Sequence, residues 1–224
     1  MAITPTSNFA RVIVVGAGGF AREVLHWARD AWPDCGRRMA GFLSSEPRPV
    51  APHSHDLAVL GDPETFVPQP GDAFLLAIGI PGVRRKVAES LEARGATLLT
   101  LVHPTAVVAS TASIGGGSIL CPFSIVSDSA RIGRCTLMNY HSSLGHDAAT
   151  GDFVVLSPYA TLGGGAHVDD DVFLGLHASV GPSKRIGPRS KVSANSVALS
   201  DAPADSLVYG VPGRVQPFVS GAAC

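Results

Sequence analysis

Two histidines and an aspartate lie close together in the segment MNYHSSLGHDAATG, residues 138–151, and these residue types allow three kinds of chemistry. His141 and His146 carry imidazoles, which Zn²⁺ often takes as ligands, so the pair could belong to a metal site. His146 is followed directly by Asp147, which suits a general base oriented by a carboxylate. The third possibility is two surface imidazoles with no shared role.

The overall composition limits the classes of partner. The 224 residues carry a formal net charge of −1, and only 16% of them are charged. Without a basic run there is no electrostatic reason to expect nucleic acid or an anionic membrane as a partner. The low charge content instead favours burial of surface between copies of the chain, and we therefore expect a homo-oligomer.

Neither a targeting segment nor cysteine chemistry is indicated. The start, MAITPTSNFARVIVVGAG, lacks a secretory signal, and no segment reaches the roughly eighteen apolar residues of a membrane span. A cytoplasmic location is therefore expected. Cys35, Cys121, Cys135 and Cys224 form no CxxC pair, so we expect reduced structural thiols and no nucleophilic cysteine.

The first part of the chain alternates strand-like and helix-like patterns. Strands are expected at 11–18, 39–45, 73–79 and 97–102, and helices at 20–32 and 83–94. This alternation predicts a small parallel α/β unit. Arg22 and Glu23 are expected on the exposed face of the first helix.

The turn GAGGFA after the first strand predicts an anion site. Gly16, Gly18 and Gly19 permit a tight turn and let the N-terminus of the following helix approach a pyrophosphate. Ser44 and Ser45 stand where a nicotinamide-binding unit carries an acidic residue, so a nicotinamide cofactor is not expected. A glycine turn that serves only strand–helix packing is the alternative.

A period of six residues begins at Val108 and runs without an insertion. Its members are Val108, Ile114, Leu120, Val126, Ile132, Met138, Leu144, Thr150, Leu156, Leu162, Val168, Leu174, Val180, Ile186, Val192 and Ala198. The residue two positions earlier is mostly small, and the residue one position later is often glycine. Such a pattern predicts short strands joined by tight turns, with three strands per eighteen-residue coil and about five coils in a parallel β-helix.

The sequence resembles the bacterial hexapeptide-repeat sugar acetyltransferases. The segments VIVVGAGGFAREV, AIG, VHPTA, GHDAATGDFVVLSPYATLGG and VYGVPGRV carry this resemblance, which spans nearly the whole chain. The family includes N-acetyltransferases of nucleotide-linked 4-amino-4,6-dideoxy sugars and sialic acid O-acetyltransferases. It implies a small Rossmann-like α/β domain over residues 1–104, a left-handed parallel β-helix over 105–203 and a C-terminal tail over 204–224.

The resemblance also implies roles for individual residues. The family's His-Asp/Glu pair corresponds to His146 and Asp147, which would be catalytic. The nucleotide sugar would contact Gly16, Gly18, Gly19, Phe20, Ser44, Ser45 and Asn139, and acetyl-CoA would contact Gly164, Leu176 and Ala194. The Gly164 N–H would face the thioester carbonyl, although a corner glycine selected for positive φ is the alternative. Val155 departs from the family, because many relatives have a second histidine there.

Together these features favour transfer of acetyl from acetyl-CoA to a sugar amine, with His146 as general base, in a homotrimer with sites between chains. A metal site would need a third imidazole two coils from His141, but thirty-six residues earlier the chain has Thr105, with His103 two positions away. We expect His103 to be structural. Sugar O-acetylation of the sialic acid type and a non-catalytic protein that binds nucleotide sugars are the alternatives.

Overall fold

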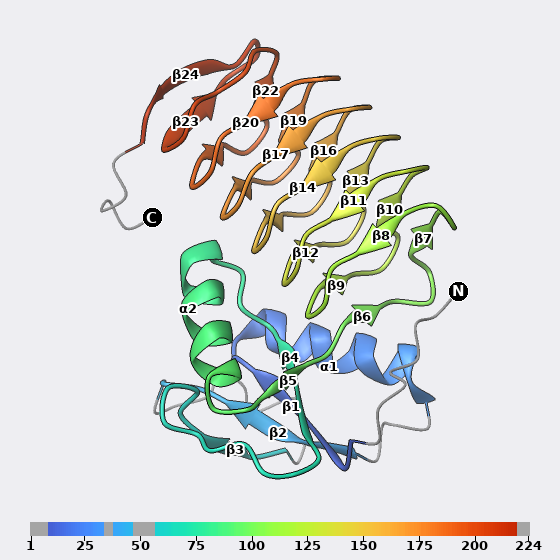
Figure 1. Cartoon of the computed structure of the whole chain (residues 1–224), viewed down its shortest axis with the longest axis vertical. Coiled ribbons are helices and arrows are strands. Elements are labelled where there is room, and N and C mark those ends of the chain that lie inside the picture. The colour runs from blue at the N-terminus through green and yellow to red at the C-terminus, as the bar shows by residue number, and fades with distance from the viewer. Residues whose placement is uncertain (1–8, 34–37, 47–56, 219–224) are drawn as a thin grey trace.

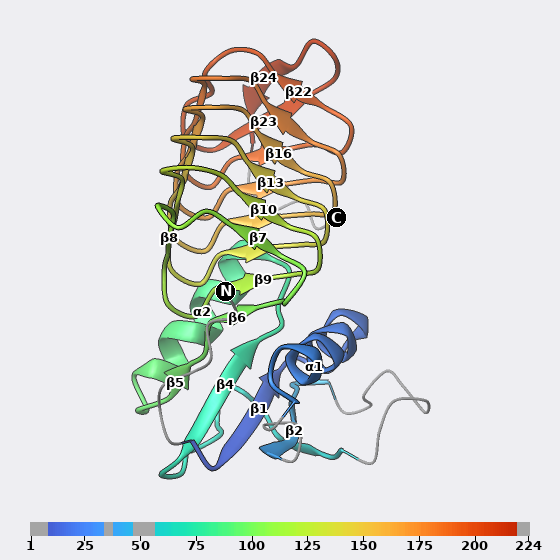
Figure 2. The same cartoon turned by 90° about the vertical axis from the view of Figure 1, so that its right-hand side faces the viewer.

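The computed structural model describes residues 9–33, 38–46 and 57–218. They form two units along the long axis of the molecule, an N-terminal α/β unit and a β-helix whose coils stack away from it (Figure 1). The view turned by 90° shows coils of similar outline from one end to the other (Figure 2). A six-residue repeat without insertions requires such a regular stack.

The N-terminal unit is built on a five-stranded parallel sheet in the order β3-β2-β1-β4-β5. The strands are β1 (Arg11–Val15), β2 (Met39–Leu43), β3 (Val59–Gly61), β4 (Asp72–Leu76) and β5 (Thr97–Leu98). Three of them fall within the predicted strands, β4 begins one residue before its predicted range, and β3 was not predicted because three residues carry no alternation to detect. The chain leaves β1 and β4 toward opposite edges of the sheet, so the carboxyl ends of these two strands flank its topological switch point.

Two helices cover this sheet on opposite sides. The first, α1 (Gly19–Ala31), buries Ala21, Val24, Leu25 and Ala28 at the spacing of an amphipathic helix. The second is α2 (Pro81–Glu92). It begins two residues before the predicted start because Pro81 fits the first turn, where a missing N–H costs nothing.

The β-helix has three parallel sheets, which we call faces 1, 2 and 3. Face 1 contains β6 (Leu101–Val102), β9 (Ile119–Leu120), β12 (Leu137–Met138), β15 (Val155–Leu156), β18 (Phe173–Leu174), β21 (Lys191–Val192), β23 (Ser206–Tyr209) and β24 (Arg214–Pro217). Face 2 contains β7 (Val107–Val108), β10 (Ile125–Val126), β13 (Ser143–Leu144), β16 (Thr161–Leu162), β19 (Ser179–Val180) and β22 (Val197–Ala198). Face 3 contains β8 (Ser113–Ile114), β11 (Arg131–Ile132), β14 (Ala149–Thr150), β17 (His167–Val168) and β20 (Arg185–Ile186).

The register confirms the predicted repeat. Each residue pairs with the one eighteen positions on, as Met138 does with Leu156 and Leu144 with Leu162. The second residue of each two-residue strand is the predicted aliphatic position, and nearly all of these side chains join one core along the helix axis. Thr150, an exception in the pattern, is also buried, and its hydroxyl accepts a hydrogen bond from Gly133 N–H at 3.1 Å.

Face 1 is covered by the N-terminal unit. Its outward side chains Ile119, Leu137 and Val155 belong to the same apolar cluster as α1 residues such as Leu25. Helix α2 instead packs toward the corner between faces 3 and 1, where Leu91 shares a cluster with residues of that corner. In Figure 1 most coils of the β-helix extend away from the N-terminal unit.

The junction between the units falls inside one apolar run. The predicted strand 97–102 is divided, because β5 pairs with β4 in the N-terminal sheet whereas β6 pairs with β9 in face 1. At the other end, β23 continues face 1 by parallel pairing with β21, and β24 closes it in an antiparallel pair. The division into 1–104, 105–203 and 204–224 remains our proposal, with face 1 extending beyond it at both ends.

Candidate active site

His146 and Asp147 form the turn between β13 and β14, at the corner between faces 2 and 3. His146 Nδ1 lies 2.8 Å from Asp147 Oδ2, and their side chains are 72% and 67% exposed. The tight turn places Asp147 at a φ of +59°, which brings its carboxylate back beside the neighbouring ring. With Nδ1 bonded to the carboxylate, Nε2 is the nitrogen left to face a substrate.

Gly164 lies one coil further on, directly against the His146 ring. A Cβ on Gly164 would lie 2.5 Å from His146 Nε2 and 2.7 Å from Cε1, so a larger residue would displace the imidazole. Positive φ does not explain this glycine, because the left-handed residue in this turn is Gly165, at +66°. The Gly164 N–H donates no hydrogen bond within the described part of the chain, so it is available to an oxyanion beside Nε2.

His141 belongs to a different corner, between faces 1 and 2. Its ring stacks on Phe123 at 5.1 Å and on Tyr159 at 4.8 Å between centroids, and Tyr159 stacks on His177 at 4.6 Å. These four rings, spaced eighteen residues apart, form what we call the ring stack. Strand β13 therefore separates His141 from His146, and no group of three potential metal-binding side chains occurs among the described residues.

Two further histidines, His103 and His167, have structural partners. His103 is buried at the junction between the units, where Nδ1 lies 2.8 Å from Thr105 Oγ1 and Nε2 lies 3.4 Å from Asp30 Oδ2. His167 Nε2 lies 3.0 Å from Asp169 Oδ1 on face 3. Neither lies at the corner that carries His146.

The glycine-rich turn lies at the switch point between β1 and β4. Gly16 has a φ of +111°, and a Cβ there would lie 2.7 Å from the Ala77 carbonyl oxygen, so glycine permits the two strand ends to meet. Gly18 is exposed with open space around it, and Gly19 begins α1. Neither α1 nor α2 has a side-chain cap or an acidic residue in its first turn, so both N-termini leave free N–H groups at this end.

Most other residues predicted to contact the sugar nucleotide lie at the same edge. Ser44 and Ser45 follow the carboxyl end of β2, and the Ser44 hydroxyl accepts a hydrogen bond from Glu46 N–H at 3.1 Å. The Phe20 ring meets Trp27 edge to face at 6.0 Å. Arg22 differs from its prediction: it is half-buried, and its Nε is buried without a partner among the described residues.

The residues predicted for the sugar amine and for acetyl-CoA are divided between corners. Asn139 follows β12 at the corner of the ring stack, where its Oδ1 accepts from the Tyr140 N–H at 2.8 Å. Leu176 and Ala194 occupy later turns of that same corner, and the Leu176 side chain is exposed. Only Gly164 lies beside His146. Val155 points outward from face 1 and is buried against the N-terminal unit.

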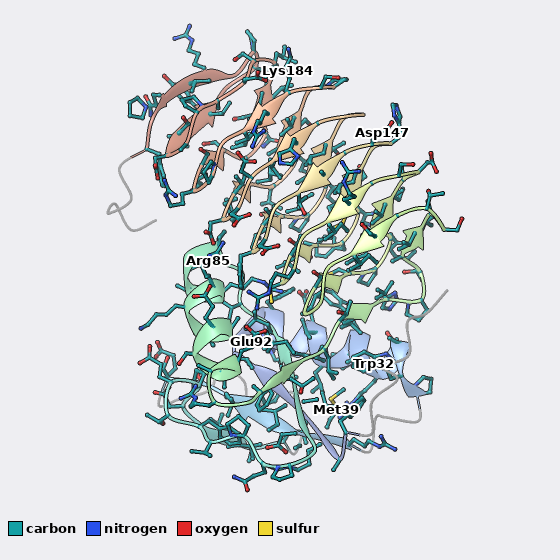
Figure 3. The ribbon with its side chains drawn as sticks, in the orientation of Figure 1. Trp32, Met39, Arg85, Glu92, Asp147 and Lys184 are labelled. Atoms are coloured by element: carbon teal, nitrogen blue, oxygen red, sulfur yellow. The ribbon has the colours of Figure 1, made fainter. Side chains whose placement is uncertain are left out.

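Within one chain, the His146 corner and the glycine-rich turn are therefore apart. Figure 3 shows Asp147 at the tip of a coil, on the side away from the N-terminal unit that carries Trp32, Arg85 and Glu92. Tyr140, by contrast, packs against the same apolar cluster as Phe20 and Ala17 of the glycine-rich turn. The predicted site residues thus fall into two groups on different sides of the chain, which we call the candidate half-sites.

Some features of these half-sites were not predicted. The turn after β4, residues 77–80, forms the second wall of the switch point, and Arg84 of α2 is fully buried beneath it. The eighteen-residue spacing of the ring stack was visible in the sequence. The burial of Arg84 was not, because its helix pattern alone gives an arginine no reason to face inward.

Comparisons with known proteins match parts of this chain. The model of the PglD N-terminal domain family matches residues 11–91. UDP-N-acetylbacillosamine N-acetyltransferase of Bacillus subtilis is 39% identical over 51 residues, which cover 23% of this chain and 24% of that protein. The match therefore spans about a quarter of this curated relative.

Solved structures extend the likeness to nearly the whole chain. A His-to-Asn variant of perosamine N-acetyltransferase from Caulobacter crescentus, in complex with CoA and GDP-perosamine, is 27% identical with a TM-score of 0.83, covering 92% of this chain and 96% of that one. In fold and in its N-terminal match, the chain resembles the bacterial hexapeptide-repeat sugar acetyltransferases. WeeI from Acinetobacter baumannii AYE resembles this chain to a similar degree, with 27% identity, a TM-score of 0.82 and coverage of 92% of this chain and 99% of that one. No described helix of the chain is long and apolar enough to span a bilayer.

Proposed function

We propose that this protein moves acetyl from acetyl-CoA to the amine of a nucleotide-linked amino-deoxy sugar, with His146 as general base. The observation that carries the proposal is the His146–Asp147 pair, whose free Nε2 lies against a glycine with an unused N–H. These are the parts that acyl transfer needs: a base for the attacking amine and a donor for the oxyanion.

The proposed reaction proceeds in two steps without a covalent enzyme intermediate. The amine attacks the thioester carbonyl, His146 Nε2 takes the proton that the amine loses, and the Gly164 N–H donates to the oxyanion. The tetrahedral intermediate then collapses, the C–S bond breaks, and the imidazolium returns its proton to the CoA thiolate. Asp147 holds the ring and stabilises its charged form.

The described thiols support a direct transfer. Cys121 and Cys135 are both buried. Burial raises the pKa of the Cys121 thiol, and likewise that of the Cys135 thiol, which disfavours the thiolate that a nucleophile needs. Cys35 and Cys224 lie outside the described residues.

The N-terminal unit is the proposed site for the nucleotide. The uncapped N-termini of α1 and α2 and the half-buried Arg22 place positive charge around an exposed glycine-rich turn. A pyrophosphate fits this positively charged turn, and the nucleotide base would extend toward Ser44 and Ser45. GDP-perosamine and CoA in the Caulobacter structure support the same pair of ligands here.

The two half-sites of one chain require a second copy to meet. We propose a homotrimer in which the His146 corner of one chain faces the Asn139 corner of the next. The outward residues of face 2, between these corners, are uncharged: Val107, Ile125, Ser143, Thr161, Ser179 and Val197. Val107 and Ile125 are 61% and 44% exposed in the single chain, which favours a contact with another copy.

A panel of acceptors tests the activity. The protein is incubated with acetyl-CoA and with UDP-, GDP- and dTDP-linked amino sugars or free sialic acid, while release of the CoA thiol is followed and the product masses are measured by mass spectrometry. We expect thiol release with at least one amino sugar and a product heavier by one acetyl group on nitrogen. Acetylation of free sialic acid alone would favour the O-acetyltransferase alternative, and no turnover with any acceptor would favour the non-catalytic one. A cytoplasmic location remains an expectation.

A further inference from the structure

Arg84 is a fully buried cation without a carboxylate among its hydrogen-bond partners. Its Nε donates to the Cys135 carbonyl at 2.6 Å, and its Nη1 donates to the carbonyls of Leu76 and Ile78 at 2.5 and 3.0 Å. Nη2 has no partner among the described residues. Burial lowers the pKa of the guanidinium to about 10. A buried charge costs stability unless it is well paired, so stability alone does not explain this residue.

Two of the three carbonyls belong to the wall of the switch point. Leu76 is the last residue of β4, and Ile78 is the second residue of the turn that follows. They flank Ala77, whose N–H donates to the Val15 carbonyl of β1 at 2.9 Å and whose carbonyl lies against Gly16. Arg84 thus holds the backbone on both sides of the residue that contacts the glycine-rich turn.

The third carbonyl belongs to the β-helix. Cys135 lies in the turn between β11 and β12, at the corner between faces 3 and 1. One rigid, planar guanidinium therefore joins the carboxyl end of β4 to the unit that carries Asn139. Its position fixes residues 77–80 relative to both the glycine-rich turn and the β-helix.

We propose that Arg84 is a positioning residue for the nucleotide sugar: it sets residues 77–80, the second wall of the nucleotide crevice. This inference rests on the proposed nucleotide-sugar substrate. The arginine acts through the backbone and touches no reacting atom, so it influences sugar-nucleotide affinity and leaves acetyl-CoA affinity unaffected.

Arg85, the next residue of α2, provides a matched control. It also joins α2 to the β-helix, through Asp171 at 2.9 Å and Asp170 at 3.2 Å and over the Phe153 ring at 4.3 Å (Figure 3). No hydrogen bond of Arg85 reaches residues 77–80. A purely structural role in holding the units together would therefore make Arg84 and Arg85 equivalent.

The experiment compares Arg84→Met, Arg84→Lys and Arg85→Met with the wild type. Binding of UDP, GDP and dTDP is measured by calorimetry, KM for acetyl-CoA by thiol release, and amide hydrogen exchange in residues 77–80 by mass spectrometry. For the nucleotide that the wild type binds, we expect Arg84→Met to weaken affinity about tenfold or more, since small misplacements of a binding wall are costly. In Arg84→Met, hydrogen exchange in residues 77–80 should accelerate, while KM for acetyl-CoA should stay unchanged. Arg84→Lys should recover part of the nucleotide affinity. Arg85→Met should change neither the nucleotide affinity nor the hydrogen exchange in residues 77–80.

Unchanged nucleotide affinity in folded Arg84→Met would overturn the proposal, as would equal losses in Arg84→Met and Arg85→Met. If Arg84→Met does not fold, the same comparison is made with Arg84→Lys, which retains the positive charge. If the wild type binds none of the three nucleotides, the nucleotide-sugar substrate is wrong. In that case hydrogen exchange still decides whether Arg84 holds the turn, because that readout needs no ligand.

Discussion

The corners at the two ends of β13 carry histidines five positions apart, yet their surroundings differ. At the corner between faces 1 and 2, both faces of the His141 ring are covered by Phe123 and Tyr159. At the corner between faces 2 and 3, His146 has Gly164 one coil away, and its Nδ1 is held by Asp147. In a β-helix the residues eighteen positions away, more than the sequence neighbours, decide what a corner side chain can do.

The largest expected difference between the corners is catalytic. We expect His146→Ala to lower kcat by roughly 10²- to 10⁴-fold, because the attacking amine loses its base. His141→Ala should leave kcat nearly unchanged, since it removes only one ring from the stack. Thiol release from acetyl-CoA measures both. Equal losses in the two variants, together with inactivation of the wild type by a chelator, would instead indicate a shared metal site.

Gly164 sharpens the comparison, because a side chain there would enter the space of the His146 ring. We expect Gly164→Ala to lower kcat by about ten- to a hundredfold through displacement of Nε2, which would lie 2.5 Å from the new Cβ. Gly116→Ala is the matched control, since a Cβ on that glycine meets nothing within 4 Å. A fully active Gly164→Ala enzyme would show that the His146 ring does not work in its observed position.

Asp147 tests how much the carboxylate adds to the imidazole. Asp147→Asn keeps the shape of the side chain but removes the charge that stabilises the imidazolium, so kcat should fall by roughly tenfold. This loss lies between those expected for His141→Ala and His146→Ala. A loss as large as that of His146→Ala, seen in steady-state kinetics at one pH, would assign the carboxylate a more direct part than orientation.

The smallest expected effect concerns the ring stack. Tyr159→Ala removes the ring between His141 and His177 and should lower the stability by about 1 kcal/mol, as exposed aromatic contacts do. That corresponds to a fall of roughly 2–4 °C in Tm, readable by calorimetry. A Tm unchanged by Tyr159→Ala would mean that the stack forms without stabilising the corner.

The repeat made the β-helix predictable, because burial in a core one side chain thick imposes its period on every strand. The same pattern could not divide residues 97–102 between two sheets, since Leu98 and Leu101 are equally apolar and only the docking of the two units separates them. The role of Arg84 could not be predicted for a similar reason: its carbonyl partners lie in two segments, the end of β4 with its following turn and the turn between β11 and β12, which only the fold brings together. The His146–Asp147 pair was readable because both residues are adjacent in the chain.

Gly164 shows the limit of a single-residue interpretation. Glycine at a β-helix corner usually suggests positive φ, but here the neighbouring Gly165 has that conformation. The reason for Gly164 is the ring one coil before it, which the sequence places eighteen residues away.

The most direct test of the account is to ask whether one active site uses His146 from one chain and the nucleotide turn from another. His146→Ala removes the base, and Gly18→Glu places a carboxylate in the open, exposed glycine-rich turn where a pyrophosphate is expected. Each variant alone should be nearly inactive. After co-refolding the two variants in equal amounts, we predict recovery of about a quarter of the wild-type activity, because that share of shared sites receives both intact halves. Mixed oligomers that form but remain as inactive as their parents would contradict a site built between chains.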